Sequence, residues 1–149
     1  MQKIQEIKLG DIKWINIINA KKDEIEYLRK NYRFDIADLG ESLSSIYSFR
    51  SKMRLRNHYL FLIMRFPYYN KQKGEIEAEE VDIFINGKTI VTLHSNNLKS
   101  ITEYFNKAAK EKSVYAKKPV TPFDIFINLI NVQYNDCYHM MDHITKDTD

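Results

Sequence analysis

The feature that most constrains the fold is a long apolar repeat in the last part of the chain. It follows Thr121-Pro122, a favourable helix start. Its apolar residues, spaced in steps of four and three, are Phe123, Ile127, Ile130, Tyr134, Cys137, Met141 and Ile144. This pattern predicts one long helix with a coiled-coil-like seam, which either packs in the core or faces a partner helix. Because no Gly or Pro closes the helix, we expect the natural chain to continue beyond Asp149.

The first part of the chain predicts a strand, two helices and a buried strand. Residues 12–18 are rich in β-branched side chains and indicate a strand. Residues 22–32 change to helical spacing, and Asp35 is a suitable N-cap for a second helix. Residues 59–64 are apolar on both faces, which is typical of a strand covered on two sides.

A β-hairpin is the strongest local prediction. Residues 81–85 and 89–93 have strand character and flank Asn86-Gly87. Both of these residues tolerate a positive φ, so the dipeptide predicts a tight type I′ turn.

One more helix and a basic loop are predicted before the long helix. Asn96 or Asn97 can cap this helix, and a basic loop follows at residues 110–118. The apolar residues of the helix are Leu98, Ile101, Phe105 and Ala108. The order of elements predicts an α/β fold, a mixed β-sheet sandwiched between helices with a long C-terminal helix. We expect an α/β domain over residues 1–120 and the start of the long helix over residues 121–149.

Size and composition exclude several classes of protein. A chain of 149 residues can bury one ordinary core without a disulfide or metal. The formal net charge of +3 is too small to indicate a nucleic-acid partner. A single cysteine, Cys137, excludes an internal disulfide and suits a reducing compartment. No apolar run approaches the roughly 20 residues of a membrane-spanning helix. No catalytic motif is present either, so we expect a protein that is not an enzyme.

Four basic residues, Arg50, Lys52, Arg54 and Arg56, share one face of a predicted strand. This stripe could follow a phosphate backbone, as in a stand-alone binding module. No aromatic residue shares the face, so base stacking has little support. The preferred interpretation is a solvated strand face that pairs with acids. The expected acids are Glu77, Glu79 and Glu80.

His139 and His143 lie four residues apart on the predicted long helix. This spacing allows two imidazoles to share one Zn²⁺, and Asp136 and Asp142 lie nearby. Both histidines fall outside the apolar seam, so two exposed side chains are the preferred alternative. Cys137 lies within the seam and is expected to be a small buried hydrophobe rather than a metal ligand.

Six short segments, in chain order, match motifs of one protein family. They are Trp14-Ile15-Asn16-Ile17, residues 36–43, Lys52-Met53-Arg54, Tyr59-Leu60-Phe61-Leu62-Ile63, residues 86–93 and residues 122–130. Together they resemble the cytoplasmic domain of CorA magnesium transporters over residues 12 to 149. The family's Gly-Met-Asn pore motif and both of its transmembrane helices are not in this sequence.

The resemblance implies a domain on the cytoplasmic side of the cell membrane, in a pentameric transporter of Mg²⁺, Co²⁺ or Ni²⁺. Its partners would be divalent metal ions and further copies of itself, with no nucleic acid. Membrane contact would come only through the missing C-terminal part. A zinc-transporting relative of similar fold is the alternative within the family. We expect this chain by itself to be mainly monomeric or weakly associated.

The resemblance also places a regulatory metal ligand at Glu41. The family's Glu-Asp pair is Gly40-Glu41 here, and its second acid joins carboxylates on a neighbouring subunit's long helix. Mg²⁺ accepts one or two carboxylates and keeps several waters, which suits such a position. The alternative is a solvated carboxylate on a helix face. Regulatory Mg²⁺ is the one expected cofactor.

Overall fold

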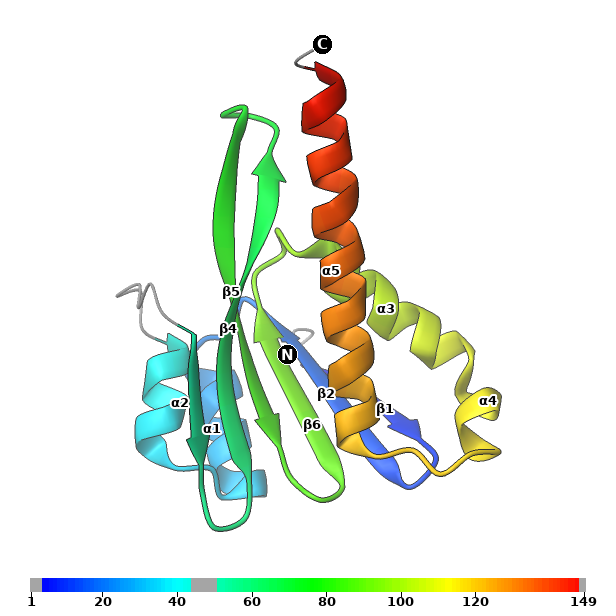
Figure 1. Ribbon diagram of the computed structural model, residues 1–149. Coiled ribbons are helices and arrows are strands. Elements are labelled where there is room, and N and C mark those ends of the chain that lie inside the picture. The colour runs from blue at the N-terminus through cyan, green and yellow to red at the C-terminus, as the bar shows by residue number, and fades with distance from the viewer. Residues whose placement is uncertain (1–3, 44–50, 148–149) are drawn as a thin grey trace.

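Six strands form one mixed sheet in the computed structural model, which describes residues 4–43 and 51–147 (Figure 1). The strands are β1 (Ile4–Leu9), β2 (Ile12–Ile18), β3 (Lys52–Leu55), β4 (Leu60–Asn70), β5 (Glu75–Ile85) and β6 (Thr89–His94). The helices are α1 (Lys22–Tyr32), α2 (Ile36–Leu43), α3 (Lys99–Lys110), α4 (Lys112–Ala116) and α5 (Pro122–Asp147). The strand order is β1-β2-β6-β5-β4-β3. β2 and β6 pair in parallel, and the other neighbours pair antiparallel.

The sheet separates two apolar layers. In β2, Trp14 points to the layer formed with α3 and α5, and the next residue, Ile15, points to the layer formed with α1 and α2. All residues of β6 are buried, as expected for a central strand covered on both faces. The predicted α/β fold, with its sandwiched sheet and long C-terminal helix, is confirmed.

Local predictions in the first part of the chain are confirmed. β2 and α1 have the predicted bounds, and Asp35 caps α2 by accepting a hydrogen bond at Oδ1 from Ala37 N at 2.8 Å. The apolar run of residues 59–64 lies in and just before β4.

The predicted hairpin joins β5 to β6, but its turn is not type I′. Asn86 N donates to Thr89 O at 3.0 Å, which makes Gly87 and Lys88 the central residues. Gly87 does not have a positive φ. Instead, Asn86 Oδ1 accepts hydrogen bonds from Lys88 N (2.9 Å) and Thr89 N (2.7 Å). The asparagine side chain therefore closes the turn that was predicted to need a left-handed backbone.

Asparagine does not cap α3 as predicted. Leu98 occupies the N-cap without a side-chain bond, and the Asn97 amide donates to Glu79 Oε1 at 2.7 Å and to Tyr68 Oη at 3.4 Å. The amide is engaged by β4 and β5, so it is not available to the helix. The predicted apolar face of α3 is confirmed as buried.

Two elements were not predicted. β1 precedes β2 and turns at Gly10, whose φ is +62°. A Cβ at this position would lie 3.2 Å from the carbonyl oxygen of Tyr115 in α4. α4 itself lies within the predicted basic loop of residues 110–118.

The face of α5 that packs on the sheet is not the predicted seam. Ile125 and Leu129 are fully buried, and Gln133 donates its amide hydrogen to Ser100 Oγ of α3 at 2.7 Å. The exposed seam residues are Phe123, Ile127, Tyr134 and Met141. The prediction that the seam forms core was wrong because the packed stripe is offset from it and includes a polar residue.

Within residues 4–43 and 51–147, no helix has both the length and the apolar character needed to cross a membrane.

Candidate functional site

The predicted ligand Glu41 lies in a cluster of charged side chains between α2 and β3. Asp38 and Glu41 are three residues apart and therefore share one face of α2. Lys52 and Arg54 alternate along β3 and extend toward that face. Arg56, just after β3, completes the cluster. Two acids thus meet three cations at one edge of the sheet.

Asp38 is the buried centre of this cluster. Its side chain is 0% exposed and accepts hydrogen bonds from the hydroxyl of Tyr59 and from Arg54 and Arg56. Burial alone would raise the pKa of Asp38, but bonds from Arg56, Tyr59 and Arg54 outweigh it and lower the pKa to about 2. Tyr59 Oη also accepts a hydrogen bond from Asp35 N at 2.9 Å. These contacts join α2 to β3 and β4.

Glu41 is at the outer side of the cluster. Its side chain is 30% exposed and accepts a hydrogen bond at Oε1 from Arg54 Nη2 at 2.8 Å. Oε2 has a longer contact, 3.4 Å, with Lys52 Nζ. The hydrogen bond from Arg54 is the main reason that the pKa of Glu41 is lowered. Its carboxylate is therefore ionised and partly accessible, and its metal role stays a prediction.

The basic stripe pairs with different acids from those predicted. Lys52, Arg54 and Arg56 form ion pairs with α2, whereas Glu77 pairs with Lys73 at 2.6 Å. Arg50 lies outside the described residues. The prediction was wrong for Glu77 and Glu79, because α2, which is remote in sequence, supplies the ion-pair partners of this strand face. Glu80 does lie near Lys52, whose charge favours the ionised form of Glu80. The stripe is thus compensated by carboxylates rather than free to follow a phosphate backbone.

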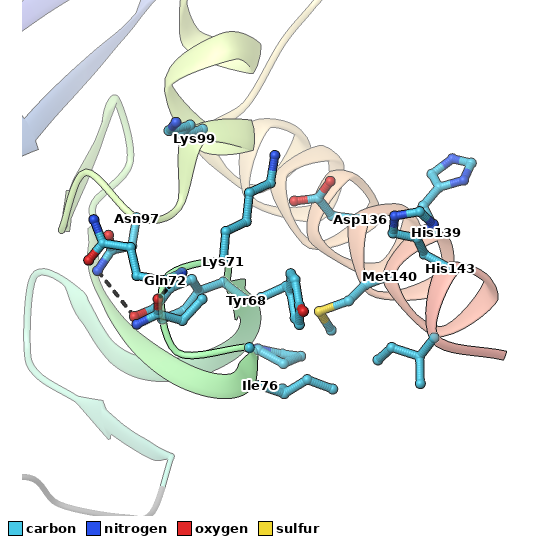
Figure 2. Close-up of a pocket in the computed structure, with 15 residues that line it drawn as sticks. Tyr68, Lys71, Gln72, Ile76, Asn97, Lys99, Asp136, His139, Met140 and His143 are labelled. Atoms are coloured by element: carbon cyan, nitrogen blue, oxygen red, sulfur yellow. Dashed lines mark hydrogen bonds between the residues drawn. The ribbon is translucent and has the colours of Figure 1, made fainter. Parts of the chain in front are cut away.

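His139 and His143 lie at a separate open cavity of about 1160 Å³, between the β4–β5 ribbon and the second half of α5 (Figure 2). Lys71 and Gln72 from the ribbon also line the cavity, and Lys71 extends toward Asp136 of α5 (Figure 2). Among the described residues, no three His, Cys, Asp or Glu side chains are placed to hold a metal ion together. The zinc role of the two histidines stays a prediction without a third ligand in this part of the chain.

Cys137, on the same helix, is half-buried rather than fully buried. Burial, together with the nearby charge of Asp136, raises the pKa of the Cys137 thiol. The protonated thiol is favoured, and the absence of a metal role for Cys137 stays a prediction.

The sequence reasoning missed Asp38. A signal was present, because Asp38 lies one helical turn before Glu41 and the basic residues alternate at Arg54 and Arg56. The pairing of Asp38 with Arg54 and Arg56 depends on how α2 docks against β3, and no local sequence pattern predicts that docking.

The fold defined by this sheet and its long helix is shared with solved structures of CorA and ZntB. The soluble domain of CorA from Methanocaldococcus jannaschii matches with a TM-score of 0.69 and 18% identity, covering 92% of this chain and 52% of that one. The complete CorA magnesium transporter of that organism gives a TM-score of 0.74 and 16% identity, covering 96% and 44%. The ZntB cytoplasmic domain from Vibrio parahaemolyticus RIMD 2210633 gives 0.71 and 16%, covering 94% and 54%. This chain therefore spans 44 to 54% of these relatives.

The chain belongs to the family described as CorA-like Mg²⁺ transporter protein, whose sequence profile matches residues 10–149. The resemblance found in the sequence is thereby confirmed. A comparison with curated proteins gave no match.

Proposed function

We propose that this chain forms the cytoplasmic, metal-sensing domain of a transporter of divalent cations and does not catalyse a reaction. Mg²⁺ is the proposed cargo, with Co²⁺ and Ni²⁺ as further substrates. The observation that carries the proposal is the match of the family profile over residues 10–149. The 26-residue helix α5 is consistent with it, since its second half extends past α3, alongside the β4–β5 ribbon (Figure 1).

The proposed mechanism is cation occupancy at the boundaries between subunits of a pentamer. Carboxylates that face one another across a boundary repel, and bound cations hold them together. When internal Mg²⁺ falls, the cations leave and the ring loosens toward an open state. Glu41 would contribute one such carboxylate.

The contacts of Glu41 indicate how it would bind a cation. Oε1 is held by Arg54 at 2.8 Å, whereas Oε2 has only the 3.4 Å contact with Lys52. Exposed Lys–Glu pairs contribute little free energy, about 0–1 kcal/mol, so Lys52 can exchange for a divalent cation. Oε2 is therefore the proposed ligand atom, and Arg54 would orient the carboxylate.

The test is transport measured against internal Mg²⁺ in the transporter that contains this domain. Glu41→Ala should require several-fold more internal Mg²⁺ to close the channel, with transport through the open pore retained, because a regulatory ligand only biases an equilibrium. Glu26→Ala is the matched control, since Glu26 is also a helical carboxylate paired with a cation, Arg29. Identical inhibition curves for wild type and Glu41→Ala would remove Glu41 from the regulatory site.

Zinc is the second candidate cargo. The fold resembles the ZntB cytoplasmic domain as closely as the CorA soluble domain, with TM-scores of 0.71 and 0.69. The same assay with Zn²⁺ in place of Mg²⁺ distinguishes the two cargoes. In the zinc case, His139 and His143 become the candidate regulatory ligands.

A further inference from the structure

A second pair of carboxyl groups lies on β5, beneath α1 and α2. Asp82 is 3% exposed, and Glu80, two residues earlier on the same face of the strand, is half-buried. The two carboxyl groups lie within hydrogen-bonding contact of each other. Asp82 Oδ1 accepts no hydrogen bond from any described residue. A buried acceptor without a donor costs free energy, so this oxygen needs a partner, either a proton or hydrogen-bond donor or a cation.

The groups around the pair come from three neighbouring elements. Glu41 and Ser42 approach from α2, Lys52 from β3 and Arg65 from β4. Glu41 adds negative potential at both carboxyls, whereas Arg65 and Lys52 favour ionised Glu80.

Burial, followed by the charge of Glu80, raises the pKa of Asp82 to about 8, and burial also raises the pKa of Glu80. Two carboxyl groups in contact cannot both be ionised unless a proton or a cation lies between them.

We propose that Asp82 and Glu80 together bind one divalent cation of the Mg²⁺ class inside a single subunit. Asp82 Oδ1 is the buried ligand, and the half-buried carboxylate of Glu80 provides the second ligand and the entry path from solvent. Two carboxylates suit this cation, which retains several waters to complete its coordination. The choice of a divalent cation rests on the proposed function, whereas the need for a proton or a cation between the two groups follows from the carboxyl pair alone.

The site would couple the sheet to α2. Cation binding replaces the shared proton, so the negative potential that Asp82 and Glu80 add to Glu41 falls when the cation is present. Unlike the proposed role of Glu41, this binding requires no second copy of the chain.

The experiment is calorimetric titration of the 149-residue chain with Mg²⁺, and separately with Mn²⁺, at pH values on either side of about 8, the pKa of Asp82. We expect one cation per chain, release of a proton below this pH, and tighter binding above it. Asp82→Asn and Glu80→Gln should each weaken binding by about tenfold or more, because each removes one of two protein ligands. Glu79→Gln is the matched control, since Glu79 lies on the same strand but bonds to Asn97 on the other side.

Two variants are needed because a loss of binding in Asp82→Asn alone does not separate a lost ligand from a lost fold. Glu80 is partly solvated, so its replacement disturbs the core less than that of Asp82. No binding by the wild-type chain at millimolar cation overturns the proposal, as does binding that both variants leave unchanged. Binding that is lost in Glu41→Gln but kept in Asp82→Asn also overturns it, while leaving the proposed function of Glu41 intact. Binding kept in Glu41→Gln and lost in the β5 variants supports it.

Discussion

Single side chains on α2 differ sharply in what surrounds them. Asp38 is completely buried and receives bonds from Tyr59, Arg54 and Arg56. Glu41, one turn later, is partly exposed and paired at the surface. The buried carboxylate of Asp38 therefore stabilises the packing of α2 against β3 and β4, whereas solvent reaches part of the Glu41 carboxylate.

Replacement of Asp38 by alanine should destabilise the chain by about 1.5–3 kcal/mol, because it removes the buried acceptor that Tyr59, Arg54 and Arg56 share. Urea unfolding measures this change. Glu41→Ala is the control and should stay near about 0.5 kcal/mol, as for exposed ion pairs. A loss for Asp38→Ala no larger than for Glu41→Ala would contradict the burial of Asp38.

The stabilisation from Asp38 should also depend on pH. The folded pKa, about 2, lies below the ordinary value of 3.8, so the contribution is fully present above the ordinary value. It is lost as the pH falls toward about 2. The difference between wild type and Asp38→Ala should shrink over that acidic window.

Asp82 should show the opposite pH dependence in the presence of a chelator. Its folded pKa, about 8, lies above the ordinary value of 3.8, so the folded state binds more protons and stability falls as the pH rises between them. Relative to wild type, Asp82→Asn should gain up to about 1.4 kcal/mol per pH unit within this window. Parallel stability profiles for the two proteins would show that Asp82 ionises normally.

At the scale of elements, α5 has two apolar faces with different environments. Ile125 and Leu129 pack beneath the helix against the sheet and α3, whereas Ile127 and Tyr134 face outward. The apolar pattern contains both sets, and only the first is covered within one chain.

A matched pair of isoleucines tests this assignment. Ile125→Ala should destabilise the chain by about 2–5 kcal/mol, since it leaves a cavity in the core. Ile127→Ala removes the same atoms from an exposed site and should cost about 0.5 kcal/mol or less. Thermal or urea unfolding of both variants gives the comparison, and equal losses would mean that the seam is buried after all.

At the scale of the whole molecule, the outward face of α5 raises the question of self-association. Its exposed apolar side chains form a narrow line along the helix rather than a broad surface. Sedimentation of the 149-residue chain should therefore show mainly monomer or weak association. A tight pentamer at micromolar concentration would contradict this prediction and show that the chain itself carries enough interface.

The sequence by itself determined most of the elements and the family. Periods of two and of about 3.6 residues are local properties, so they identified β2, α1, the β5–β6 hairpin and α5. β1 and α4 were missed because short edge or surface elements show little periodicity. The place of Glu41 on α2 followed from the resemblance to the family.

The tertiary structure alone decided which side chains meet. Asp38 joins Arg54 and Arg56, Gln133 enters the core through Ser100, and Asp82 lies buried beside Glu80. These contacts depend on how helices and strands remote in sequence dock against one another. Hydrophobic periodicity predicts that a face is apolar, but it does not identify the element that packs against that face. Burial also determines which carboxyl groups keep a proton and which stay ionised, since it removes the water that would otherwise solvate their charge.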